Sequence, residues 1–107
     1  MKDISIDVLQ TLCQSKRILW REHALQRMNE RNILKEDVRH CIEYGIIIEY
    51  YPEDYPVPSC LILGTDQNGK EMHVVCSAFE NMACVITAYY PDRDKWQDDF
   101  KTRKEAE

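Results

Sequence analysis

Several features that define common functional classes are missing from this sequence. Its 107 residues include only three glycines, and none belongs to the glycine-rich loop that cradles a phosphate. No apolar run approaches the roughly 20 residues of a membrane span, so we expect no contact with a membrane. The five cysteines lack the close pairs that mark a zinc site or a disulfide scaffold. The sequence therefore predicts neither a metal site nor another cofactor.

Positive charge is scarce as well. The chain carries 14 Lys and Arg against 19 Asp and Glu, for a net charge of -5, so any contact with RNA has to be local. The odd number of cysteines favours reduced thiols, and Met1 to Asp3 does not begin a targeting segment, so we expect a cytoplasmic protein. The length fits one domain over residues 1–107, with a core over about 17–100 and a charged C-terminal tail. A homodimer is compatible with these features.

Helical periodicity dominates the first half of the chain. Three stretches have apolar residues at helical spacing, namely 4–12, 22–31 and 35–44. Asp3 or Ser5 is suited to cap the first helix. Asn32 follows the second helix and is suited to the left-handed conformation of a C-terminal cap. Gly45 is expected to end the third helix.

Strand-like patterns dominate the second half. The predicted strands are 17–20, 46–51, 59–64, 71–79 and 82–90. Asn68 and Gly69 indicate a tight hairpin turn, and residues 71–79 are apolar on both faces, which predicts a central strand. Trp96 and Phe100 have the i, i+4 spacing of a final helical turn. The order predicts an α+β fold, with two or three N-terminal helices packed on an antiparallel four- to five-stranded sheet.

The second predicted helix carries an unusual group of polar side chains. His23, Arg27 and Arg31 share one flank because they are one helical turn apart, while apolar residues occupy the other flank. Two arginines at i, i+4 repel each other, which indicates an anion nearby. That anion is either a phosphate, which a guanidinium group binds with two hydrogen bonds, or a carboxylate such as Glu30 or Asp37 in an internal salt-bridge network.

These residue types suit the cleavage of RNA without a metal. That reaction needs a base for the ribose 2′-hydroxyl, cations for the pentavalent phosphorane, and an acid for the departing 5′-oxygen. The candidate catalytic residues are His23, Arg27, Arg31 and His73. Tyr50 and Tyr89 are candidates for stacking on bases of the substrate. The structural alternatives are a strand histidine satisfied by a neighbour and tyrosines that pack at the rim of the sheet.

The order of several motifs resembles a known bacterial family. The motifs are W.EHALQRMNERNI...DV, G.I...YPED.P.PSCLILG, HVVCS and ITAYYPD...W..DF, from about Ile18 to Arg103. This pattern resembles the domain of unknown function 4258 family and, more distantly, toxins of the RelE and BrnT type. The resemblance implies helices packed against a curved antiparallel sheet whose open side cleaves RNA. It assigns the functional positions to His23, Arg27, Arg31, His73 and Tyr89.

The resemblance also implies a partner and a function. Several relatives look like the toxin halves of toxin-antitoxin pairs, some encoded beside a small zinc-finger antitoxin. Two positions differ from the usual pattern, since Asn32 replaces a glycine and Leu34 replaces a capping Ser or Thr. The leading hypothesis is a toxin-like, metal-independent endoribonuclease that contacts RNA and an antitoxin. The alternative is a non-catalytic protein-binding or regulatory module that retains the fold and turns over no RNA.

Overall fold

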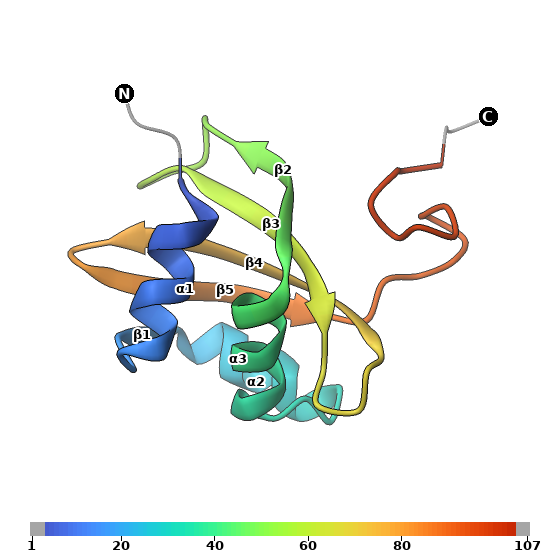
Figure 1. Cartoon of the computed structure of the whole chain (residues 1–107), viewed down its shortest axis with the longest axis horizontal. Helices are drawn as coiled ribbons and strands as arrows, with labels where there is room; N and C mark the ends of the chain where they lie inside the picture. The colour runs from blue at the N-terminus through green and yellow to red at the C-terminus, as the bar shows by residue number, and fades with distance from the viewer. Residues whose placement is uncertain (1–3, 105–107) are drawn as a thin grey trace.

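The chain adopts an α+β fold, in agreement with the prediction (Figure 1). The computed structural model describes residues 4–104. The elements in chain order are α1 (Ile6–Gln14), β1 (Ile18–Trp20), α2 (Glu22–Glu30), α3 (Lys35–Tyr44), β2 (Ile46–Tyr51), β3 (Ser59–Thr65), β4 (Glu71–Phe79) and β5 (Met82–Tyr89). All three predicted helices and all five predicted strands are present. The likeness to RelE and BrnT remains a prediction.

The five strands form one sheet in the order β1-β5-β4-β3-β2. The strand β4 lies at the centre, as its two apolar faces predicted. The strand β1 pairs parallel to β5, whereas every other pair is antiparallel, so the sheet is mixed. The parallel pair arises because the chain passes through the helices and three strands before β5 returns beside β1. In the outer strand β2, a bulge between Ile47 and Glu49 breaks the pairing with β3.

Local signals in the sequence define the helix ends and turns. The side chain of Ser5 accepts a hydrogen bond from the Asp7 N–H at 3.1 Å and caps α1; Asp3, the other predicted cap, lies outside the described residues. Asn32 has a φ of 57° and ends the α2 region in the predicted left-handed conformation. The turn before β4 uses Gly69 at a φ of 85°, which confirms the predicted hairpin.

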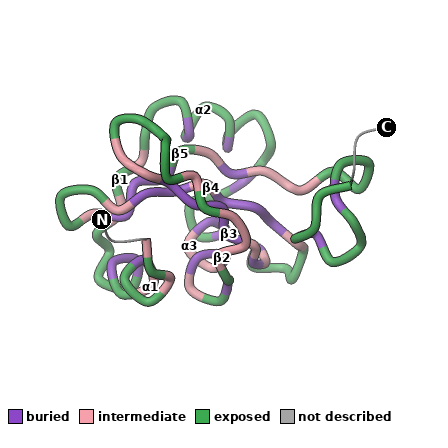
Figure 2. Tube along the Cα trace, turned by 90° about the horizontal axis from the view of Figure 1, so that it is seen from above, coloured by how far each residue is buried: buried purple, intermediate pink, exposed green. Residues whose placement is uncertain are grey.

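The main core lies between the sheet and the helices α1 and α3, which cover the same side of the sheet in Figure 2. From α1, Leu9, Leu12 and Cys13 are buried in it, so the core begins before the predicted boundary at residue 17. A Cβ atom at Gly64 would collide with the backbone of Cys41, which shows how closely α3 lies on β3. All five cysteines are buried free thiols.

Residues 91–104 follow β5 and are named here the C-terminal strap (Figure 1). The predicted helical turn over Trp96 and Phe100 is wrong. The strap instead forms turns and one isolated bridge between Trp96 and Arg103. Both aromatic side chains are buried against Leu61 of β3, on the sheet face opposite α1 and α3. Packing onto the sheet therefore replaces the aromatic contact along a helix that the i, i+4 spacing suggested.

Candidate functional site

The helix α2 lies along the outer edge of β5. Because β1 pairs only with residues 83–85, it leaves the following part of β5 free, and α2 occupies that space. Ala24 and Met28 are buried and hold the helix against the core. After the helix, Arg31 donates from Nη1 to the Ala88 carbonyl oxygen of β5 at 2.8 Å. The polar flank of α2 is thus fixed relative to the sheet, with its side chains outward.

A pocket of about 450 Å³ opens between the N-terminus of α2 and the loop that joins β2 to β3. We call it the α2 pocket. Its lining residues are Arg21, Glu22, His23, Asp54, Tyr55, Pro56, Val57, Ser77 and Ile86. Its volume is in the range of small-molecule binding sites. His23 is exposed there and, within residues 4–104, its side chain has no hydrogen bond or ion pair, so its ring nitrogens are free for a ligand.

Arg21 stands beside His23 in this pocket and is positioned by the sheet. It is the N-terminal cap residue of α2, and its Nε donates to the Cys84 Sγ of β5 at 3.2 Å. This contact orients the guanidinium group while the two Nη groups keep their donors. Opposite it, the Tyr55 side chain is 95% exposed, and Asp54 accepts a hydrogen bond from the hydroxyl of Ser59. The pocket thus combines a cation, an imidazole, an aromatic ring and two carboxylates, those of Glu22 and Asp54.

The two predicted arginines do not line the α2 pocket. Arg27 lies 3.6 Å from Glu30, and both side chains are more than half exposed, so this ion pair adds little to stability. Arg31 binds the backbone of β5. Asp37 does not join them, because its carboxylate accepts from the Leu34 N–H and from Gln67. The alternative of an internal salt-bridge network is therefore reduced to one exposed pair, Arg27 with Glu30.

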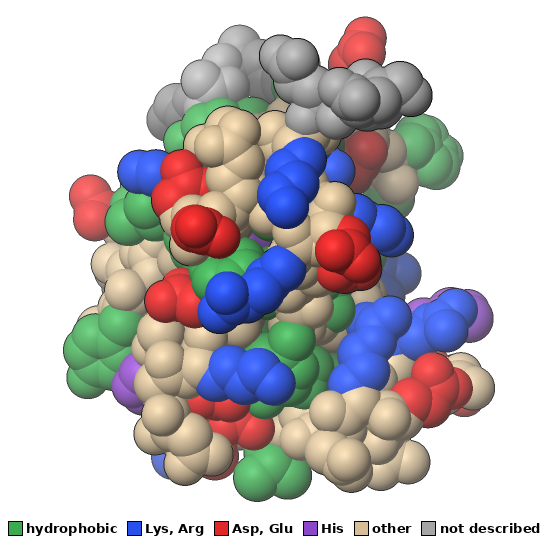
Figure 3. Space-filling view, turned by 90° about the vertical axis from the view of Figure 1, so that its right-hand side faces the viewer, with side chains coloured by type: hydrophobic (Ala, Val, Ile, Leu, Met, Phe, Trp, Pro, Cys, Tyr) green, Lys and Arg blue, Asp and Glu red, His purple; other side chains and the backbone are tan. Residues whose placement is uncertain are grey.

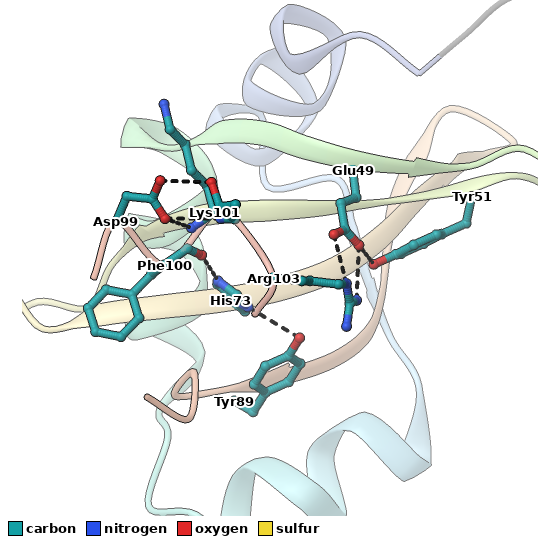
Figure 4. A network of polar contacts seen from close by, with 9 residues as sticks. Glu49, Tyr51, His73, Tyr89, Asp99, Phe100, Lys101 and Arg103 are labelled. Carbon is teal, nitrogen blue, oxygen red and sulfur yellow. Dashed lines mark hydrogen bonds and ion pairs between the residues drawn. The ribbon is translucent and has the colours of Figure 1, made fainter. Parts of the chain in front are cut away.

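His73 has a very different environment, shown in Figure 4. Its side chain is fully buried. Nε2 lies 2.6 Å from the Phe100 carbonyl oxygen, and Nδ1 lies 3.2 Å from the Tyr89 hydroxyl. Because a carbonyl only accepts, Nε2 carries the proton and Nδ1 accepts from Tyr89. Burial lowers the pKa of His73 below its usual 6.5, so the ring is neutral at neutral pH, and the predicted contact of His73 with a substrate is blocked by the strap.

An ion pair lies beside His73 and joins the strap to the outer strand. Arg103 donates from Nε and Nη2 to the two carboxylate oxygens of Glu49, at 2.8 and 3.0 Å. Tyr51 donates its hydroxyl to the same carboxylate at 2.7 Å. The Arg103 hydrogen bonds lower the pKa of Glu49, whereas burial and the nearby carboxylate raise the pKa of Tyr51 to about 12. Glu49 is thereby held ionised and Tyr51 neutral, and hydrogen bonding to Glu49 raises the pKa of Arg103, which stays charged.

The predicted site residues are thus not gathered in one place. His73 and Tyr89 pair across β4 and β5 under the strap, while His23 lines the α2 pocket. Ser77 in that pocket lies on the same face of β4 as His73, at a distance of about 13 Å along an extended strand. Ser77, at the pocket, is thus too far from His73 for one phosphate to contact both. Tyr50 pairs with Cys60, whose side chain is in the helix-side core, so the register places Tyr50 on the helix side of the sheet, away from His73 and Tyr89.

Sequence reasoning missed most of the α2 pocket. Arg21, Tyr55 and Ser77 come from three segments far apart in the chain, and no spacing pattern connects them. The signal for Tyr55 was its position in an acidic and aromatic loop bounded by prolines. The signal for Arg21 was its place directly before a helix that begins with exposed polar residues. Neither signal indicates that Arg21 and Tyr55 lie beside His23 in one pocket.

The charge on the surface is mixed. Figure 3 looks at the side of the strap and shows Lys and Arg side chains interspersed with acidic ones, so this face has no continuous basic surface. Within the part of the chain that the structure describes, no three His, Cys, Asp or Glu residues are placed to hold a metal ion. No helix in residues 4–104 has the length and apolar character needed to cross a membrane.

Comparison with known proteins places the chain in a family. No curated protein and no solved structure matches it. The family described as Domain of unknown function (DUF4258) matches residues 20–90, which run from the end of β1 to just past β5 and include α2, α3 and the other four strands. The matched region contains the α2 pocket and ends where the C-terminal strap begins. The chain is therefore a member of the DUF4258 family.

Proposed function

We propose that the protein is a toxin-like endoribonuclease that binds single-stranded RNA at the α2 pocket. The observation that carries this proposal is the position of His23, an exposed imidazole in a pocket of about 450 Å³, with the guanidinium group of Arg21 beside it. An imidazole and a fixed cation are the groups that cleavage next to a ribose 2′-hydroxyl requires. The reaction proposed needs no resident metal ion.

In the proposed reaction, His23 takes the proton of the 2′-hydroxyl. The 2′-oxygen then attacks the adjacent phosphorus, and the bond from phosphorus to the 5′-oxygen breaks, which leaves a 2′,3′-cyclic phosphate. The departing 5′-oxygen takes a proton from solvent, to which the pocket is open. The Nη groups of Arg21 stabilise the charge of the phosphorane because Cys84 holds the guanidinium group by its Nε. Tyr55 supports a stacked base.

The remaining basic residues have a supporting role in this proposal. Arg27 is exposed on the turn of α2 after His23, where it would bind a phosphate further along the strand. Such a local contact suits a chain whose net charge is -5. A zinc-finger antitoxin encoded nearby is the proposed protein partner, and covering the α2 pocket would be the direct way for it to block RNA. A cytoplasmic location and a homodimer remain predictions.

The proposal is tested by incubating the purified protein with single-stranded RNA in the presence of a chelator. We expect cleavage that leaves 2′,3′-cyclic phosphate ends. His23→Gln should abolish cleavage, whereas Gln26→Ala, an exposed change in the same helix outside the pocket, should not. Expression of the wild type should arrest growth of the host, and His23→Gln should relieve the arrest. If His23→Gln cleaves RNA as fast as Gln26→Ala does, the activity belongs to a contaminant and the proposal is refuted.

A second function, a binding module without catalysis, is favoured by one observation. The second histidine, His73, is fully buried under the strap, so the exposed sheet face holds one imidazole where many RNA-cleaving sites use two acid-base groups. This alternative predicts RNA or protein binding with no turnover. Binding that His23→Gln leaves unchanged, together with intact RNA after long incubation, would establish the binding module over the nuclease.

A further inference from the structure

The C-terminal strap lies on the same sheet face as the α2 pocket, at the other end of β4. It places Trp96 and Phe100, with 3% and 9% of their surface exposed, against Leu61 of β3. The family match ends at residue 90, so the strap directly follows the matched region. It covers the part of the sheet face that continues from the pocket toward the end of β5.

The strap covers a cluster of polar groups on the sheet face. Glu49, His73 and Tyr89 all point toward it in Figure 4. The strap supplies a partner to two of them: the Phe100 carbonyl oxygen accepts from His73, and Arg103 donates to Glu49. The third, Tyr89, donates its hydroxyl to His73. Each of the two strap contacts is one that a nucleotide can replace, because an RNA strand offers acceptor oxygens for an imidazole N–H and base amino groups for a carboxylate.

The strap is attached to the sheet through a small number of contacts. It contains neither a helix nor a strand, apart from the bridge between Trp96 and Arg103. Several of its hydrogen bonds are internal and stay intact if it moves as a unit, such as those from Lys101 and Thr102 to Asp99. Two buried aromatic rings, the hydrogen bond from His73 to the Phe100 carbonyl oxygen and one ion pair, whose Arg103 side chain is 56% exposed, oppose the conformational entropy of the segment. A segment held by so few contacts opens more readily than the strands beneath it.

We propose that the strap is a built-in cover that competes with RNA for this half of the sheet face. When it opens, the nucleotides that flank the one in the α2 pocket bind to Glu49, His73 and Tyr89. His73 then acts as a binding group for a neighbouring nucleotide, because its separation from the pocket is about two nucleotide steps along β4. This inference rests on the proposed function, since it extends the RNA-binding surface of the same site and makes its affinity depend on the open fraction of the strap.

The test compares two variants that each remove one positive charge from the strap. Arg103→Gln breaks the ion pair with Glu49, whereas Lys104→Gln changes an exposed neighbour whose side chain has no ion pair among the described residues. Affinity is measured for a single-stranded oligonucleotide long enough to span both halves and for a mononucleotide that fills only the pocket. We expect Arg103→Gln to raise the oligonucleotide affinity about threefold or more, with the mononucleotide affinity unchanged. Lys104→Gln should not raise either.

Loss of a positive charge alone would weaken RNA binding. A gain of affinity in Arg103→Gln therefore shows that the sheet face under the strap has been uncovered. Equal or lower oligonucleotide affinity in both variants would overturn the cover. A second readout is the rate at which His73 reacts with diethyl pyrocarbonate, followed by mass spectrometry, which should be about threefold higher in Arg103→Gln than in the wild type and in Lys104→Gln. Unchanged protection of His73 in Arg103→Gln would also overturn it.

Deletion of residues 92–107 gives the complementary test. If the shortened chain stays folded by circular dichroism, it should bind the oligonucleotide at least as tightly as Arg103→Gln, and no gain would refute the cover. If it unfolds, Arg103→Gln and the His73 reaction decide. The proposed function has a separate outcome: a mononucleotide that binds in the wild type and not in His23→Gln upholds the α2 pocket even when the strap variants show no gain. If a protein partner releases the strap and RNA does not, the inference is refuted as well.

Discussion

A histidine lies at each end of one sheet face, His23 on α2 and His73 on β4. The surroundings of the two histidines are opposite. His23 stands at the rim of an open pocket with no partner among the described residues. His73 is fully buried, with a hydrogen-bond partner on each ring nitrogen. The same side chain is thus available for proton transfer at one end and serves as a structural bridge at the other. The difference comes from the strap, a segment that follows the whole sheet in the chain.

The largest expected effect separates the two histidines by activity. His23→Gln should lower the rate of RNA cleavage at least about 100-fold, because the proton acceptor is lost, while the melting temperature stays unchanged because the side chain is exposed. Rates and melting curves of the wild type, His23→Gln and Gln26→Ala check this prediction. A large loss of thermal stability in His23→Gln would give this residue the structural role now assigned to His73.

The second effect separates them by stability. His73→Ala should reduce the free energy of unfolding by about 2–4 kcal/mol, because it leaves a cavity and an unsatisfied Phe100 carbonyl group. Urea denaturation followed by circular dichroism measures the change. The cleavage rate per folded molecule on a substrate that fills only the α2 pocket should remain within a few-fold of the wild type. A rate that falls as strongly as in His23→Gln would show that the two histidines act together.

A pH titration of stability gives a smaller effect. Because burial lowers the folded pKa of His73 below 6.5, the unfolded chain binds more protons between these two values, and the fold loses stability as the pH falls through this window. Glu49 and Arg103, the charged groups nearby, keep their charges there, since the pKa of Glu49 is itself lowered. Melting temperatures between pH 8 and pH 5.5 should fall in the wild type. The slope should be shallower in His73→Asn, and an equal slope would contradict the assignment.

The smallest effect concerns the ion pair that joins the strap to β2. Arg103→Gln and Glu49→Gln should each lower stability by about 0.5–1 kcal/mol, since the Arg103 side chain is more than half exposed and water screens the pair. A double-mutant cycle in urea isolates the coupling between the two residues. Lys104→Gln serves as the control for charge. A coupling near zero would leave Trp96 and Phe100 as the main attachment of the strap.

Much of the fold could be predicted because it depends on local signals. The helical periodicity, the left-handed cap at Asn32 and the turn at Gly69 depend on neighbours in the chain. The central place of β4 was also predictable, because both of its faces are apolar and both must therefore be covered. The parallel pairing of β1 was not, since a run of three residues does not identify its partner strand.

The candidate site could be predicted only in part. The polar flank of α2 followed from helical spacing, and it led to His23. The covering of His73 depends on residues 27 positions later, where Phe100 supplies its partner, and the i, i+4 spacing of Trp96 and Phe100 favoured a helix instead. Arg21 and Tyr55 meet His23 only through the tertiary fold. Long-range contacts, which no local pattern records, thus decide which of the predicted residues are accessible.

The bulge in β2 has a consequence for solutions of high concentration. β2 is the outermost strand on its side, and a regular outer strand offers its free N–H and C=O groups to the same strand of another molecule. The extra residue between Ile47 and Glu49 puts those groups out of step, and the charge of Glu49 adds to the mismatch. The bulge and this charge therefore disfavour edge-to-edge pairing of two molecules through β2.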